Sequence, residues 1–269
     1  MSKFRYILFI SSFIIFFTSC SKYNKLLKGN DNEKKFEAAE KYYKQEDFYK
    51  AQQLLEDLLT YFRGTEKAEK VYYYYAYCYY GQQDYVMASY HFKNFAMTFP
   101  QSSKAEECLF MSAYCYYFDS PIYSLDQTNT YKAINELQLF VNKYPKSSKV
   151  EECNRIIDEL RHKLELKAFE IAKLYLKTEE YKAAIVAFDN VIKDFPDTKF
   201  REEIIFLTLK ANYFYAKNSI ENKKQERLKL TVAAYKQYTS KYPQGIYIKE
   251  VEAIYQNVLK EIKNKNYNI

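Results

Sequence analysis

The chain has 269 residues and a formal net charge of +7, from 41 Lys and Arg against 34 Asp and Glu. Its 4 Gly and 5 Pro are too few for a sandwich or barrel with many tight turns, whereas long stretches of Lys, Glu, Gln, Leu and Ala indicate mostly helix. The basic residues are interspersed with acidic ones and form no long run, so we expect no nucleic-acid partner.

The amino-terminal residues have the pattern of a bacterial lipoprotein signal. Lys3 and Arg5 precede an apolar run over residues 6–17, which is shorter than the roughly 20 residues of a membrane span but suits a secretory signal. Thr18-Ser19-Cys20 follows and resembles a lipobox. We expect residues 1–19 to be removed, Cys20 to carry the lipid and residues 20–32 to form a lipidated linker. The alternative is an ordinary signal peptide followed by a cysteine by chance.

Ser21 stands where an aspartate would favour retention in the inner membrane, and no acidic export cluster follows it. Acyl chains on Cys20 would anchor the protein stably without any spanning helix. The predicted location is therefore the outer membrane, with the protein lipid-anchored and facing the periplasm.

Five predicted helix ends share one pattern, an aromatic residue followed in four cases by proline: Phe62-Arg63, Phe99-Pro100, Tyr144-Pro145, Phe195-Pro196 and Tyr242-Pro243. Twelve residues before the second member of each pair lies a small residue: Ala51, Ala88, Ala133, Ala184 and Thr231. Large apolar residues lie eight and five positions before it: Leu55, Phe92, Leu137, Phe188, Tyr235, Leu58, Phe95, Phe140, Val191 and Tyr238. These offsets place the three residues of each set on one stripe of their helix, which gives a predicted stripe of fifteen residues over five helices.

This spacing is the framework of tetratricopeptide repeats, in which small residues let paired helices approach and the proline ends the second helix. We predict an all-α fold, a right-handed α-solenoid of about five tetratricopeptide-like helix pairs over residues 33–262, followed by a tail over 263–269. A heptad coiled coil or an irregular helical bundle is the alternative. The regular small residues and the aligned helix ends disfavour it.

The helix ends lie 37, 45, 51 and 47 residues apart, against about 34 in the standard repeat. The extra residues predict an inserted loop over 119–129 and a long unbroken helix from about residue 148 to 177. They also predict a polar stretch, residues 217–227, between the helices of the fifth repeat.

The sequence offers little for catalysis. His91 and His162 are the two histidines and neither has a metal-ligand spacing. Four glycines leave no phosphate-binding loop or nucleophile elbow. We therefore expect no enzyme activity, no cofactor and no metal.

Four cysteines follow Cys20, at positions that pair between repeats: Cys78 with Cys115, and Cys108 with Cys153. Equivalent positions on stacked helices lie about 8–10 Å apart, whereas a disulfide needs α-carbons within about 7 Å. We expect four buried free thiols, with a disulfide as the alternative.

The lipobox, the five degenerate repeats, the loop with Leu125-Asp126-Gln127-Thr128 and the helix end Lys143-Tyr144-Pro145 together resemble the BamD family of the Bacteroidetes type. BamD is the lipoprotein of the outer-membrane β-barrel assembly machinery. The resemblance implies a scaffold that binds BamA through its carboxy-terminal repeats and unfolded outer-membrane proteins through its amino-terminal repeats. Arg63 in place of proline, and Gln244-Gly245 in the last helix end, depart from the family.

The resemblance also directs the choice of binding residues. One predicted helix contains seven tyrosines between residues 72 and 80, so we expect several to be exposed in a groove. We assign client binding to Tyr75, Tyr79 and Tyr116, although each can instead pack between repeats. Arg201 opens a helix in the region that the family uses for BamA, and a merely solvated arginine is the alternative.

Two other functions remain open. The first is a repeat scaffold for envelope polysaccharide or division machinery. The second is a glycan receptor, which the absence of tryptophan disfavours.

Overall fold

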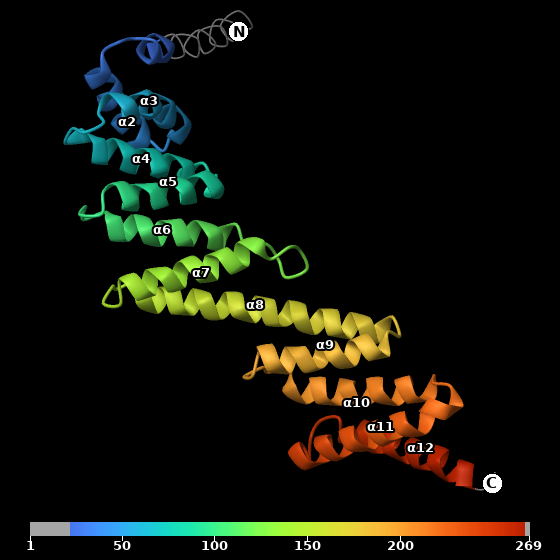
Figure 1. Cartoon of the computed structure of the whole chain (residues 1–269). Coiled ribbons are helices and arrows are strands. Elements are labelled where there is room, and N and C mark those ends of the chain that lie inside the picture. Colours follow the sequence, from blue (N-terminus) through green and yellow to red (C-terminus); the bar gives the residue numbers. More distant parts are fainter. Residues whose placement is uncertain (1–21, 267–269) are drawn as a thin grey trace, which may run out of the picture. The chain divides into compact units, whose positions relative to one another are not determined.

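The computed structural model describes residues 22–266, and Cys20 with the predicted signal lies outside the described residues. The described part is all-helical, without strands, and a short helical segment over residues 22–27 precedes the repeats (Figure 1). The helices are α2 (Asn32–Lys44), α3 (Phe48–Tyr61), α4 (Lys67–Gly81), α5 (Tyr85–Thr98), α6 (Ala105–Phe118), α7 (Thr128–Lys143), α8 (Val150–Lys177), α9 (Tyr181–Asp194), α10 (Arg201–Lys217), α11 (Glu221–Lys241) and α12 (Ile248–Asn266).

The chain forms two compact units. The first comprises the described residues up to 121 together with 125–160, and the second comprises 122–124 together with the chain from 161 onward. Within each unit, consecutive helices pack side by side as antiparallel neighbours, α2 to α7 in the first and α9 to α12 in the second. The predicted all-α stack of tetratricopeptide-like helix pairs is confirmed.

The predicted stripe forms the core of both units. Fourteen of its fifteen residues are at most 1% exposed, from Ala51 in α3 to Tyr238 in α11. Ala39, Ala76 and Ala172, on the facing first helices, are fully buried as well. The one partly buried member, Tyr235, stacks on Tyr255 of α12 with ring centroids 3.9 Å apart. Close approach of small residues therefore holds each helix pair together, as the spacing predicts.

The second helices end where the aromatic residues stand. Phe99, Tyr144, Phe195 and Tyr242 each cap a helix with φ between −121° and −133°, which suits a residue that precedes proline. Phe62 lacks that proline, and its φ of −86° and ψ of 6° continue the helix into a turn. The first repeat therefore ends less sharply than the others.

Two predicted departures from the standard repeat are confirmed. A loop separates α6, which ends at Phe118, from α7, which begins at Thr128, and α8 runs without a break from Val150 to Lys177. The third expectation, a polar stretch over 217–227 between helices, is wrong because most of it belongs to α11. Strong helix formers fill residues 223–227, and Lys224 pairs with Glu261 of α12.

Cys78, Cys108, Cys115 and Cys153 are buried free thiols, as expected. Burial raises the pKa of Cys78 and of Cys115 to about 12, so both thiols stay protonated and unreactive near neutral pH. None of the described helices combines the length and the hydrophobicity needed to span a bilayer. Helix α12 continues to Asn266, four residues past the predicted end of the repeats.

Candidate protein-binding surfaces

The sequence predicted that several tyrosines of α4 are exposed, but none of them is fully exposed. All seven are buried or half-buried. The reason is that α4 contacts α2 and α3 on one side and α5 on the other, so neighbouring helices cover more than one of its faces. The rings pack between repeats while several hydroxyls reach polar partners. A helix that is stacked between two repeats therefore buries more than one of its faces.

Glu107 of α6 accepts hydrogen bonds from the hydroxyls of two of these tyrosines. Tyr73 donates to Glu107 Oε1 at 2.8 Å and Tyr77 donates to the same oxygen at 2.6 Å. Burial opposes ionisation of Glu107, but the hydrogen bonds from Tyr77, Tyr73 and Lys104 outweigh it and lower the pKa of this carboxyl. Tyr73 and Glu107 are 34 residues apart, the length of a standard repeat, so this contact links the first helices of consecutive repeats.

Tyr75 and Tyr79 belong to an aromatic cage around His91 of α5. The rings of Tyr72, Tyr75, Tyr79 and Tyr90 lie with centroids 4.8–6.0 Å from the imidazole, and the Tyr79 ring stacks on it. Neither ring nitrogen of His91 has a hydrogen-bond partner among the described residues. Tyr75 is only 4% exposed, so its ring supports this cage and is out of reach of a bound peptide. Tyr79 is half-buried and keeps part of its ring at the surface.

The cage predicts a loss of stability on acidification. Burial lowers the pKa of His91 to about 4, opposed by the charge of Asp84, against about 6.5 in an unfolded chain. As the pH falls, His91 therefore binds a proton in the unfolded state before it does so in the folded state. The contribution of neutral His91 to the free energy of unfolding is complete above about pH 6.5 and is lost as the pH drops toward 4. We expect His91→Phe to lose less stability than the wild type between pH 7 and pH 5 in urea unfolding. Equal losses in the two proteins would contradict this assignment.

Tyr116 of α6 is half-buried, and the ammonium group of Lys132 lies 5.7 Å from its ring centroid. It lies apart from the His91 cage, so Tyr75, Tyr79 and Tyr116 do not form one cluster of direct contacts. Of these three tyrosines, Tyr79 and Tyr116 leave part of the ring accessible to a partner.

Arg201 is the first residue of α10, in the second unit. Its guanidinium donates to the carbonyl oxygen of Pro196, in the turn that precedes the helix. Arg201 is partly exposed, and a single contact leaves further donors of its planar group for a partner. The prediction that Arg201 lies at the start of a helix is therefore confirmed.

The neighbouring residue, Glu202, organises a polar network that the sequence analysis missed. Its Oε1 accepts from the Tyr238 hydroxyl and from the Ile246 backbone nitrogen, both at 2.7 Å. Gly245 is required here, since a β-carbon would collide with the Glu202 carboxylate and the Tyr238 hydroxyl. The unusual Gln244-Gly245 helix end thus has a structural cause. Its one signal in the sequence was a glycine in a chain that has only four.

A groove of about 420 Å³ runs along α10 toward α8 and α9 within the second unit. Leu207 and the stacked pair Tyr181 and Phe214, with centroids 5.6 Å apart, supply apolar surface. Lys177 and Lys210 also line the groove and form no ion pair within the described residues. Glu179 and Glu203 line the same groove, so it offers apolar surface together with both positive and negative side chains. Such a mixed lining suits a protein segment with apolar and charged side chains.

No group of three or more His, Cys, Asp or Glu side chains within residues 22–266 is arranged to hold a metal. The surfaces just described consist of partly exposed aromatic side chains, one groove and charged side chains on stacked helices. They define a helical-repeat protein with the surfaces of a binding scaffold.

Residues 28–228 match the family YfiO, described as outer membrane lipoprotein. The match covers more than half of the chain, so the protein belongs to this BamD-type family of outer membrane lipoproteins. No curated protein matches the chain.

Two solved helical-repeat structures are similar in part. The TPR2AB domain of yeast Sti1, solved in a complex with pHSP90, is 14% identical with a TM-score of 0.40, over 84% of this chain and 98% of that one. TPR-like repeats of a Podospora anserina kinesin light chain are 15% identical with a TM-score of 0.33, over 77% and 96%.

Proposed function

We propose that this protein is a non-catalytic scaffold of the outer-membrane β-barrel assembly complex, held at the periplasmic face of the outer membrane by a lipid on Cys20. The observation that carries the proposal is membership of the outer membrane lipoprotein family over residues 28–228. Two units of stacked helix pairs support it, because such stacks offer long surfaces for protein segments.

The two units have different surfaces, which suits two kinds of partner. In the first unit, Tyr79 and Tyr116 offer partly exposed rings, and aromatic surface suits the aromatic-rich segments of unfolded outer-membrane proteins. In the second unit, Arg201 opens α10, and Leu207, Lys210 and Phe214 of the same helix line the groove described above. We assign client binding to the first unit and binding of a BamA-like barrel protein to the second.

The alternative is a repeat scaffold for other envelope machinery, for polysaccharide or cell division. The same stacked helices would serve either partner set. The identity of the bound proteins separates the two functions, because a barrel protein with periplasmic domains is expected in one complex and is foreign to the other.

Isolation of the full-length lipidated protein from membranes in mild detergent tests the proposal. We expect one BamA-like barrel protein to remain bound through the purification and to dissociate when the second unit is altered. An untagged strain serves as the control for nonspecific capture. Recovery of only polysaccharide or division proteins would contradict the proposal and support the alternative.

A further inference from the structure

The first helical turns after the predicted lipid attachment site are docked on the first repeat. Tyr23 is 7% exposed, and its hydroxyl lies 3.1 Å from the Lys50 carbonyl oxygen and 2.8 Å from Gln53 Oε1, both in α3. Leu26 and Leu27 pack against the same core. Residues 22–27 therefore have a fixed place on the first repeat, and the segment that the sequence suggested as a linker is largely folded onto it.

The exposed side of this segment carries only positive charge. Lys22, Lys25 and Lys28 follow one another at intervals of three residues, and residues 22–30 contain no acidic side chain. None of the three forms an ion pair within the described residues. The next acid along the chain, Asp31, is paired with Lys34 at 2.6 Å. We call Lys22, Lys25 and Lys28 the lysine stripe.

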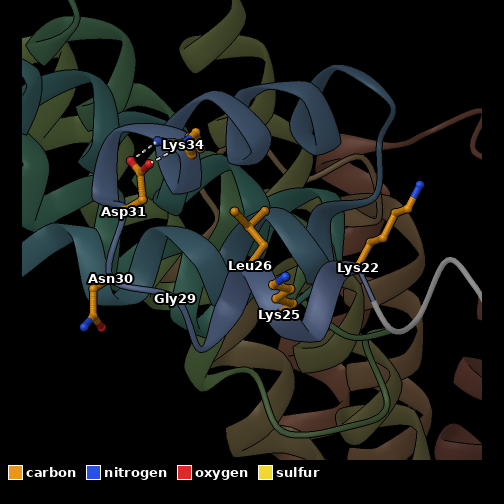
Figure 2. Close-up of a pocket in the computed structure, with 7 residues that line it drawn as sticks. All are labelled: Lys22, Lys25, Leu26, Gly29, Asn30, Asp31 and Lys34. Carbon is orange, nitrogen blue, oxygen red and sulfur yellow. Dashed lines mark hydrogen bonds and ion pairs between the residues drawn. The ribbon is translucent and has the colours of Figure 1, made fainter.

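An open hollow of about 340 Å³ lies beside the stripe, between residues 22–29 and the start of α2. Figure 2 shows Asp31 and Lys34 facing each other at one side of the hollow, while the Lys22 side chain extends away from that pair. Lys22 and Lys25 have no ion-pair partner among the described residues, whereas the Asn30 amide extends away from both lysines. The ammonium groups of Lys22 and Lys25 suit anionic phosphate groups.

The position of the stripe identifies where such a group would come from. Cys20 is two residues before Lys22, so their α-carbons are at most about 7 Å apart. At 1.5 Å per residue, Lys28 lies about 9 Å further along a helix. Both lengths are close to the Debye length of about 8–10 Å. A lipid on Cys20 would therefore bring the stripe into the range over which charges at a bilayer surface act.

We propose that the lysine stripe binds the headgroups of anionic phospholipids in the membrane that holds the anchor, so that the first repeat rests against the bilayer. This inference rests on the lipid anchor of the proposed function. A single acyl chain binds membranes only marginally, and a polybasic patch is a second signal that makes such binding stable. The contacts of Tyr23 hold the stripe in a fixed position on the first repeat.

Vesicle binding by the mature chain with Cys20→Ser, which has no acyl chain, isolates the stripe. We expect binding to vesicles that contain phosphatidylglycerol and not to pure phosphatidylcholine, with affinity falling as salt is added. Each Lys→Gln change in the stripe should weaken binding about fivefold, and all three together on the order of 100-fold. The matched control changes three exposed lysines of the second unit to Gln and keeps the wild-type affinity: Lys236, Lys241 and Lys249.

Three outcomes would overturn the inference: equal affinity of the triple stripe variant and the wild type, an equal loss in the control, or displacement by inorganic phosphate at constant ionic strength. The last would indicate a site for soluble phosphate. Labelling of the full chain with a radioactive fatty acid, compared with Cys20→Ala, tests the anchor separately. A labelled protein without vesicle binding refutes the stripe alone, whereas an unlabelled protein refutes the anchor.

Discussion

Ala88→Lys and Ala184→Lys are each expected to lower the free energy of unfolding by about 3–5 kcal/mol. Both alanines lie at the small-residue position of a second helix, and both are 0% exposed. A lysine at either site must place four methylenes and an ammonium group where two helices are in contact. The cost combines overpacking with the desolvation of an unpaired charge, and these helices have no room to relax without separating.

Urea unfolding followed by circular dichroism measures the effect. Ala233→Lys is the matched control, because Ala233 is exposed on α11, and we expect it to change stability by less than about 0.5 kcal/mol. Ala88 lies in the first unit and Ala184 in the second, so the two variants test the repeat register in each unit independently. Unfolding curves like that of the wild type for both variants would show that the register is wrong.

The core of this fold could be predicted from the sequence because buried residues recur at the spacing of the helical turn. Offsets of twelve, eight and five residues from each helix end selected residues such as Ala133, Leu137 and Phe140, all of which are fully buried. Proline after the aromatic residue fixed four helix ends to the residue, since proline constrains the backbone of the residue before it. Where the proline is missing, at Arg63, the helix ends in a looser turn.

The binding surfaces could be predicted less well, because they depend on contacts between different helices and not on the pattern within one helix. Whether Tyr75 is buried depends on which side chains of α5 lie beside it. The His91 ring lies 4.8 Å from the Tyr75 ring, and the sequence pattern of α4 alone does not predict this contact. The polar residues after Ile220 resembled a loop, yet their ion pair with α12 and their helix propensity keep them helical. In both cases a contact with another helix determines the structure, and the sequence pattern of the segment itself does not.

Arg201→Glu is expected to weaken binding of the BamA-like partner more than tenfold while binding of client peptides stays unchanged. A planar guanidinium can hold a carboxylate through two hydrogen bonds, and a reversed charge in a desolvated contact costs about 2–5 kcal/mol of affinity. The one visible contact of Arg201, with the Pro196 carbonyl, lies on its own chain and leaves the outer edge of the group accessible. Affinities measured by calorimetry for purified partner domains and for a client peptide give both values on the same preparation.

Two further variants make this division of labour testable. Lys229→Glu carries the same change of charge on an exposed residue of α11 and should keep full affinity for the BamA-like partner, which excludes a general electrostatic effect. The complement is Tyr79→Ala with Tyr116→Ala, which should weaken client binding and spare the barrel protein, since both rings lie in the first unit. Tyr75 is left intact because it is only 4% exposed, and circular dichroism checks that the variant folds, since Tyr79→Ala removes a ring that stacks on His91. Full affinity of Arg201→Glu for the barrel protein, or equal loss of both partners by both variants, would refute the assignment of one partner to each unit.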